Sequence, residues 1–134
     1  MLGPYPQWKT IAELLRARAQ ARPADLAISI VGNSLTYAEL DRLTDRVGAN
    51  LAALGVKKGD RVASFAYNCI EQVLVWFGCM KIGAIWVPFN VALIGSDLKY
   101  TLEDAAPKVI VADSETRPRI DALFASGRYD IKLF

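Results

Sequence analysis

Apolar and polar side chains alternate along this chain in two patterns, one typical of helices and one typical of strands. Between residues 37 and 54, apolar side chains recur every three or four positions, which places them on one face of a helix. These side chains are Leu40, Leu43, Val47, Leu51 and Leu54. Thr36 and Glu39 form a capping box at the start of this helix, and Gly55 can take the left-handed conformation that ends it.

Similar patterns divide the rest of the chain into helices and short strands. Thr10 and Glu13 form another capping box, and Asn68 is the predicted cap of a later helix. The predicted helices span about residues 11–21, 37–54, 69–82, 96–106 and 115–124. The predicted strands span residues 27–31, 34–36, 61–67, 84–87, 108–112 and 130–133, of which the first two form a hairpin. Because strands alternate with helices, the predicted fold class is α/β with a largely parallel sheet.

Length and hydrophobicity limit how this chain is organised. Its 134 residues suffice for one domain with a core, so residues 1–134 are predicted to form a single α/β unit. Hydrophobic residues make up 53% of the chain and the mean hydropathy is +0.22, which is apolar for a small domain. Some of this apolar surface is expected to meet a neighbour, so self-association is predicted.

No segment has the pattern of a membrane span or of a secretory signal. The longest apolar run, residues 73–80, is less than half of the about 20 residues that a bilayer-spanning helix needs. The N-terminal segment lacks a basic stretch followed by an apolar stretch. A cytoplasmic protein without a transmembrane segment is therefore expected.

Opposite charges are nearly balanced and interspersed. Lys and Arg number 16, Asp and Glu number 14, and no block of one sign occurs, which argues against a nucleic-acid-binding surface. Two groups of arginines, one in the first helix and one near the end of the chain, are interpreted as solvated faces. They are Arg16, Arg18 and Arg22, and Arg117 and Arg119.

Few residues offer catalytic or metal-binding chemistry. Histidine is absent from the sequence, which excludes Ser-His and Cys-His nucleophile pairs and most zinc sites. Cys69 and Cys79 are separated by about 15 Å along one predicted helix, too far for a disulfide, and Cys79 is predicted to be a buried, inert thiol. The glycines form no phosphate-binding pattern and are interpreted mainly as residues at element ends. No catalytic, cofactor-binding or metal-binding residue is predicted.

Three pairs of charged residues could in principle hold Mg²⁺ or act as acid and base. They are Asp41 with Asp45, Glu103 with Asp104, and Asp60 with Arg61. The first two pairs are interpreted as solvated helix faces. The third is interpreted as an exposed charge pair in a loop.

Asn90 is the one position predicted to lie beside a ligand site. Open α/β sheets bind ligands beyond the carboxyl ends of their strands, and Asn90 follows such an end. Asparagine is also a common turn residue that hydrogen-bonds its own backbone, and this structural interpretation is preferred. Four aromatic residues are predicted to pack in a core or against another domain, with an acyl pocket as the alternative. They are Trp76, Phe77, Trp86 and Phe89.

Two blocks of sequence resemble the opening of an adenylate-forming acyl-CoA synthetase. The first block contains Thr36, Tyr37, Leu40, Leu54, Gly55, Gly59, Asp60, Arg61 and Val62. The second contains Gly83, Ala84, Val87, Pro88 and Asn90, and a looser similarity extends over residues 100–113. Within the family, the chain looks most similar to synthetases for medium or long acyl chains and for carnitine or crotonobetaine.

The resemblance implies an enzyme that activates a carboxylic acid with ATP and Mg²⁺ as an acyl-adenylate and then transfers the acyl group to coenzyme A. The family's phosphate-gripping loop, its later acidic residues and its adenylation lysine have no counterpart in residues 1–134. Residues 1–134 are therefore expected to be an incomplete N-terminal portion of a larger AMP-binding domain, a non-catalytic scaffold without a cofactor of its own. The alternative is a stand-alone α/β module that binds a small molecule or a protein.

Overall fold

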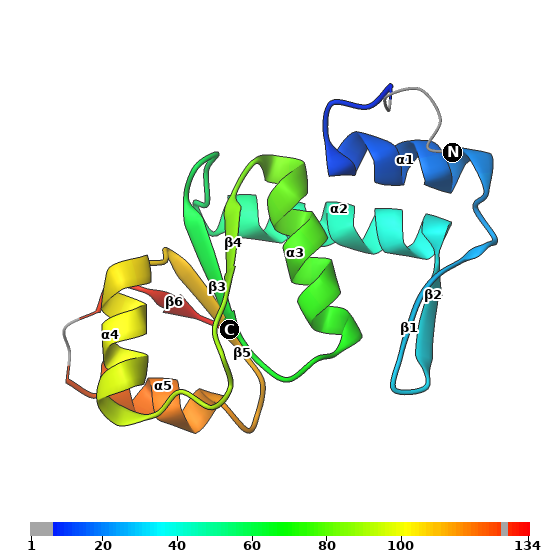
Figure 1. The fold of residues 1–134 in the computed structure, drawn as a ribbon. Helices are drawn as coiled ribbons and strands as arrows, with labels where there is room; N and C mark the ends of the chain where they lie inside the picture. The colour runs from blue at the N-terminus through cyan, green and yellow to red at the C-terminus, as the bar shows by residue number, and fades with distance from the viewer. Residues whose placement is uncertain (1–6, 127–128) are drawn as a thin grey trace.

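Two sheets organise the chain, a parallel sheet of four strands and an antiparallel hairpin (Figure 1). The computed structural model describes residues 7–126 and 129–134. Its helices are α1 (Ile11–Ala21), α2 (Tyr37–Ala53), α3 (Ile70–Ile82), α4 (Gly95–Ala105) and α5 (Arg117–Phe124). Its strands are β1 (Leu26–Ile30), β2 (Asn33–Thr36), β3 (Arg61–Phe65), β4 (Ile85–Pro88), β5 (Val109–Ala112) and β6 (Lys132–Leu133).

The larger sheet has the order β4–β3–β5–β6, and all of its neighbouring strands are parallel. Ala63 at its centre pairs with Val87 on one side and with Ile110 on the other. A helix connects each strand of this sheet to the next along the chain, as parallel pairing requires. The predicted α/β class and the largely parallel sheet are confirmed.

The two faces of this sheet support two separate cores. Successive side chains of a strand point to opposite faces, so Val62 and Ala63 belong to different clusters. Val62 and Val109 pack with residues of α2 and α3, including Leu51 and Cys79. The opposite face packs against α4 and α5, through Phe65, Leu98, Leu102, Ile110 and Ile120. Helices therefore cover both faces of the central strands (Figure 1).

Glycines bring α2 and α3 into close contact. Gly48 and Gly78 face each other within the two helices, and a methyl group added at Gly78 would lie 2.6 Å from Val47 Cγ1 and 3.2 Å from the Gly48 nitrogen. The interpretation of the glycines as residues at element ends is wrong for these two. It holds for Gly55 and Gly83, which have φ of +89° and +73° just after α2 and α3.

Caps define the helix starts in two of the three predicted cases. The capping box of α2 is present, with Glu39 accepting from the Thr36 nitrogen at 2.8 Å and Thr36 Oγ1 accepting from the Glu39 nitrogen. Thr10 accepts from the Glu13 nitrogen at the start of α1. The predicted cap at Asn68 is wrong, because the residue before α3 is Cys69, which makes no side-chain capping bond.

Several predicted boundaries shift by one to a few residues. The third strand ends at Phe65 instead of residue 67, because the Tyr67 nitrogen donates to Asp113 and leaves the ladder. The last helix begins at Arg117 instead of residue 115, because Asp113 Oδ1 binds the nitrogens of Glu115 and Thr116 in a turn. In the part of the chain that the structure describes, no helix has the length and hydrophobicity needed to cross a bilayer.

Candidate functional site

A hollow of about 680 Å³ opens beyond the carboxyl ends of β3 and β4. Its walls come from the end of β1, the loop after β3, the first turns of α3 and the end of β4, and include Tyr67, Asn68, Val73, Trp76, Trp86 and Asn90. This strand-end hollow occupies the edge of the sheet where open α/β folds bind ligands. Its volume falls in the range of about 300–1,000 Å³ that small-molecule sites have.

Aromatic rings form one wall of the strand-end hollow, and a polar chain holds them. The rings of Trp76 and Trp86 stack with centroids 5.6 Å apart. Trp86 Nε1 donates to Ser64 Oγ at 2.9 Å, and Ser64 Oγ donates to Gln72 Oε1 at 2.6 Å. Gln72 Nε2 in turn donates to the Ala66 carbonyl. The buried hydroxyl of Ser64 thus fixes the indole ring, and both the hydroxyl and the indole nitrogen have hydrogen-bond partners.

The four aromatic residues predicted to form one group divide between two environments. Trp76 contacts both Phe77 and Trp86, with the Phe77 centroid 4.9 Å away. Phe89 instead packs edge-on against Phe65, at 6.3 Å, in the core beneath α4 and α5. The prediction of core packing is confirmed for Phe89, which is buried, although it lines the strand-end hollow together with Trp76 and Trp86.

Asn90 lies at the rim of the strand-end hollow, where it also forms a turn. Its Oδ1 accepts a hydrogen bond from the Ala92 nitrogen at 2.9 Å. The residue therefore forms the turn that the preferred structural interpretation predicted. Its Nδ2 has no hydrogen-bond partner among residues 7–126 and 129–134. A role of Asn90 beside a ligand stays a prediction.

Side chains that follow β5 anchor the loops that come after β3 and after β4. Asp113 Oδ2 accepts from the Tyr67 nitrogen at 2.8 Å, and Thr116 Oγ1 donates to the Phe65 carbonyl. Burial opposes ionisation of Asp113, but the hydrogen bonds from Tyr67 and Thr116 outweigh it, so the pKa of Asp113 is lowered. The loop after β3 is therefore anchored to the neighbouring strand's turn.

Arg119 performs the same task for the loop after β4. Its Nη1 donates to the carbonyls of Val91 and Leu93, at 2.6 and 3.1 Å. Its guanidinium also lies over the Phe65 ring, 5.0 Å from the centroid. The interpretation of Arg119 as part of a solvated face is wrong, because its side chain binds the loop after β4. These partners are distant in sequence, so no local pattern predicts them.

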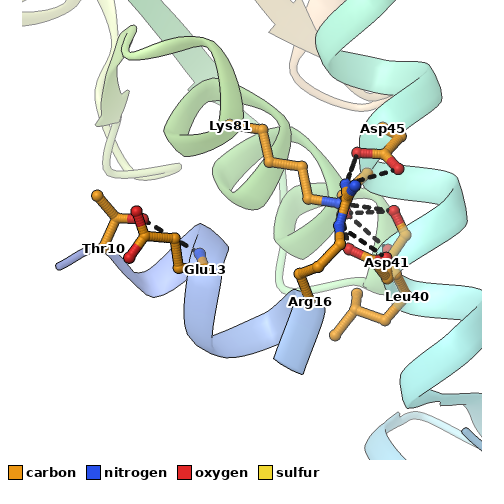
Figure 2. A network of polar contacts seen from close by, with 8 residues as sticks. Thr10, Glu13, Arg16, Leu40, Asp41, Asp45 and Lys81 are labelled. Carbon is orange, nitrogen blue, oxygen red and sulfur yellow. Dashed lines mark hydrogen bonds and ion pairs between the residues drawn. The ribbon is translucent and has the colours of Figure 1, made fainter. Parts of the chain in front are cut away.

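Asp41 and Asp45 belong to an ion network between three helices, shown in Figure 2. Lys81 Nζ of α3 lies 2.6 Å from Asp41 Oδ1 and 2.8 Å from Asp45 Oδ1. Arg16 of α1 contacts both carboxylates from the other side. The Lys81 side chain is only 8% exposed. The interpretation as a solvated face is wrong for Asp41, which is 16% exposed, but it holds for Arg16 and Asp45, which are 49% and 46% exposed although they form ion pairs.

Asp60 and Arg61 do not form the predicted charge pair with each other. Asp60 Oδ2 accepts from the Lys57 nitrogen and pairs with Lys108 at 3.1 Å, whereas Arg61 Nε donates to the Ala105 carbonyl. Both side chains thus fasten the turn before β3 to the turn before β5. Neither contact resembles an acid and base arranged around a substrate.

The lining of the strand-end hollow offers little for acid, base or metal chemistry. It includes no Asp, Glu, Lys or Arg side chain. Burial raises the pKa of the Cys69 thiol there, and it raises that of the buried Cys79 to about 11, so both free thiols are weak nucleophiles at neutral pH. Among the described residues, no group of three His, Cys, Asp or Glu side chains is arranged to hold a metal ion.

Comparison with known proteins decides the family. Residues 15–130 match the sequence profile of the family described as AMP-binding enzyme. The chain belongs to the AMP-binding enzyme family. The resemblance to adenylate-forming synthetases in the two sequence blocks is therefore confirmed.

Curated relatives in this family are several times longer than the chain. It is 35% identical over 121 residues to the long-chain-fatty-acid–CoA ligase FadD13 of Mycobacterium tuberculosis, which covers 89% of the chain and 24% of the relative. It is 37% identical over 83 residues to the crotonobetaine/carnitine–CoA ligase of Salmonella typhimurium, covering 62% of the chain and 16% of that ligase. The chain spans about a quarter of the length of the first of these relatives.

A solved structure shares the arrangement of helices and strands. The Mycobacterium tuberculosis fatty acyl CoA synthetase superposes with a TM-score of 0.86 at 32% identity. The match covers 93% of this chain and 26% of that one. The α/β unit described above is thus similar to one part of a larger synthetase.

Proposed function

We propose that this chain forms the first part of the AMP-binding domain of an ATP-dependent acid:CoA ligase. The observation that carries the proposal is the family match over residues 15–130, together with relatives that are ligases about four times as long. In such an enzyme the acid's carboxylate displaces pyrophosphate from ATP to give an acyl-adenylate. The thiol of coenzyme A then displaces AMP to give the acyl-CoA.

Within this ligase, residues 1–134 serve as a non-catalytic scaffold, an incomplete portion of the larger domain. The strand-end hollow has no charged side chain to bind phosphates or Mg²⁺, so ATP, Mg²⁺ and coenzyme A do not fit its lining. We assign these groups to the whole enzyme and derive no chemical step from the residues described. The whole enzyme acts in the cytoplasm.

The acid is a fatty acid of medium or long chain. The support comes from FadD13, whose name specifies long-chain fatty acids. A carnitine-like acid is the competing substrate, since a crotonobetaine/carnitine ligase is also similar, over 62% of the chain.

The proposal is tested first on the purified chain and on its gene. We expect no acyl-CoA from the chain with ATP, Mg²⁺, coenzyme A and a fatty acid, and no heat of binding when ATP–Mg²⁺ is titrated into it. We expect the gene to continue in frame past Phe134 into a Ser/Thr/Gly-rich loop. Acyl-CoA formation by the chain alone would disprove the scaffold role, and a stop codon after Phe134 would disprove the larger ligase.

The competing function is a stand-alone α/β module that binds a small molecule or a protein. The strand-end hollow favours it, because residues of this chain line the hollow by themselves. The gene's reading frame separates the two functions, since only the ligase requires a continuation.

A further inference from the structure

Helix α1 contacts the rest of the fold along a narrow seam. Its buried residues are Leu15 and Ala19, which lie one helical turn apart. A hollow of about 310 Å³ flanks the seam on one side and a hollow of about 410 Å³ on the other. Ile11 lines the first and Gln20 the second, from opposite sides of the helix. An element held by so few apolar contacts opens at a lower free energy than the core does.

The polar attachment of α1 is also small, and it is exposed. Among the residues that the structure describes, Arg16 is the one residue of α1 whose side chain bonds another element. Its guanidinium lies 2.6 Å from Asp45 Oδ1 and 3.3 Å from Asp41 Oδ2 (Figure 2). Arg16 is 49% exposed, whereas Lys81, which joins the same carboxylates to α3, is 8% exposed. Because salt screens exposed ion pairs much more than buried ones, added salt weakens the attachment of α1 and spares the one between α2 and α3.

The chain just after α1 is fixed to the start of α2. The Pro23 carbonyl accepts from the Ala38 nitrogen at 3.1 Å, and the Asp25 carbonyl accepts from the Tyr37 nitrogen at 3.0 Å. Arg22, which ends α1, lies between these hydrogen bonds and the helix. Since neither hydrogen bond involves α1, the helix can leave its place without disturbing the hairpin or the first turn of α2.

We infer that α1 opens as one unit about Arg22 while the rest of the fold stays intact, and that rising ionic strength favours the open form by weakening the bridge from Arg16. Helices shorter than about 12–15 residues are marginal in isolation, so an open α1 loses its helical hydrogen bonds. Opening also removes the α1 wall of the 310 Å³ hollow and exposes apolar side chains that line it from other elements, including Leu40 and Phe77. Ionic strength thus controls how much apolar surface the protein presents. The inference rests on the contacts of α1 alone, so it holds whether or not the ligase proposal is correct.

Hydrogen exchange followed by mass spectrometry tests the inference on the purified chain. We expect the hydrogen-bonded amides of α1 to share one protection factor, at least about tenfold below that of α2 and α3 and at least about tenfold above that of an unfolded peptide. Raising NaCl from about 0.02 M to about 0.5 M should speed exchange in α1 about threefold and leave α2 and α3 unchanged.

Arg16→Met isolates the bridge, since methionine keeps a long side chain and a high helix propensity. The variant should exchange about threefold faster in α1 at low salt, and added NaCl should have no further effect because the bridge that salt screens is already absent. Arg46→Met is the matched control, because Arg46 is an exposed arginine of α2 with no ion pair in the described part of the chain. It should change exchange in α1 by less than about 1.5-fold.

Four results would overturn the inference. Amides of α1 that exchange as slowly as those of α2 would show that α1 opens only when the whole fold does, and amides as fast as in an unfolded peptide would show that it never docks. Protection that falls gradually toward one end of α1 would indicate fraying. An effect of NaCl that persists in Arg16→Met, or an equal effect of Arg46→Met, would exclude the bridge as its cause. None of these results bears on ATP binding or on the gene's reading frame, which test the ligase proposal separately.

Discussion

Asp113 joins the ends of two parallel strands through one side chain. Its carboxylate accepts from the nitrogens of Tyr67, Glu115 and Thr116, at 2.8, 3.0 and 2.8 Å. These backbone donors would otherwise lack partners at the point where β3 and β5 end. These hydrogen bonds stabilise the ionised carboxylate, so the pKa of Asp113 is lowered despite partial burial.

We predict that Asp113→Ala costs about 1–2 kcal/mol of unfolding free energy at pH 7, because several backbone donors lose their acceptor. Since the folded-state pKa lies below the ordinary value of about 3.9, this contribution is complete above pH 4 and disappears as the pH falls through the folded-state pKa. Urea unfolding at pH 7 and at lower pH values measures the difference between wild type and variant.

The control for this residue is Asp121→Ala. Asp121 is 55% exposed and pairs only across one helical turn with Arg117, so its loss should change the unfolding free energy by less than about 0.5 kcal/mol. A difference between Asp113→Ala and wild type that stays constant down to pH 2 would contradict the assigned role of the ionised carboxylate.

Helices α2 and α3 approach each other closely where they cross. Gly48 and Gly78 have no side chains that would hold the helices apart, and Val47 Cγ1 occupies the space that a methyl group at Gly78 would need. The obstacle includes the backbone nitrogen of Gly48, which cannot rotate away. The separation of the two helices is therefore set by glycine.

Gly78→Ala should lower the unfolding free energy by about 1–3 kcal/mol, because the strain of the added methyl group exceeds the gain of less than about 1 kcal/mol from alanine's helix propensity. Thermal and urea denaturation measure the effect. The double variant Val47→Ala/Gly78→Ala should recover part of the loss, since it removes the Cγ1 atom that lies nearest. Equal or greater stability of Gly78→Ala would show that the helices separate at no cost.

A second contact between elements is the ion network of Figure 2, which ties α1 to α2 and α3. Lys81 is the most buried of its members, and its ammonium group bonds the Asp41 carbonyl as well as both carboxylates. Arg16 and Asp45 are about half exposed, so their part is weakened by solvent.

Lys81→Met should lower the unfolding free energy by about 2 kcal/mol. This loss is smaller than the loss expected when a fully buried ion pair is broken, because Arg16 still faces Asp41. Lys99→Met is the matched control, since Lys99 makes one exposed contact with Glu103 at 4.0 Å and should change stability by less than about 0.5 kcal/mol. Chemical denaturation of both variants gives the comparison. Equal effects of the two substitutions would show that burial of the network contributes nothing.

At the scale of the whole molecule, large apolar side chains remain at the surface of the described residues. They include Ile85, Ile94, Tyr100 and Phe134, which are 50%, 66%, 70% and 49% exposed. Ile85 also lies on β4, an edge strand of the parallel sheet as described, where unpaired backbone groups are available to another chain. Self-association through this surface stays a prediction.

Light scattering and sedimentation should show an average mass that rises with protein concentration, because association would bury these side chains. Ile85→Lys should weaken the association by placing a charge on the edge strand. A monomer at high concentration that binds no dye for exposed apolar surface would contradict the prediction, and so would unchanged association of Ile85→Lys.

Local patterns in the sequence determined the elements of this protein and their order. The spacing of Leu40, Leu51 and their neighbours predicted α2, and the Thr36 capping box predicted its start, because both signals act within one or two helical turns. Alternation of strands and helices predicted the parallel sheet. The position of Asn90 beyond a strand end could also be read from the sequence, since that end follows from the strand's own limits.

Only the tertiary structure decided which distant residues meet. Lys81 forms an ion pair with Asp41, Arg119 donates a hydrogen bond to Val91, and Gly48 packs against Gly78, each across separate elements. Their charges or small size are visible in the sequence, but their partners depend on how helices pack on the two faces of the sheet. The strand-end hollow has the same origin, because its walls come from the loop after β3, from α3 and from the end of β4, which parallel pairing of β3 and β4 brings together.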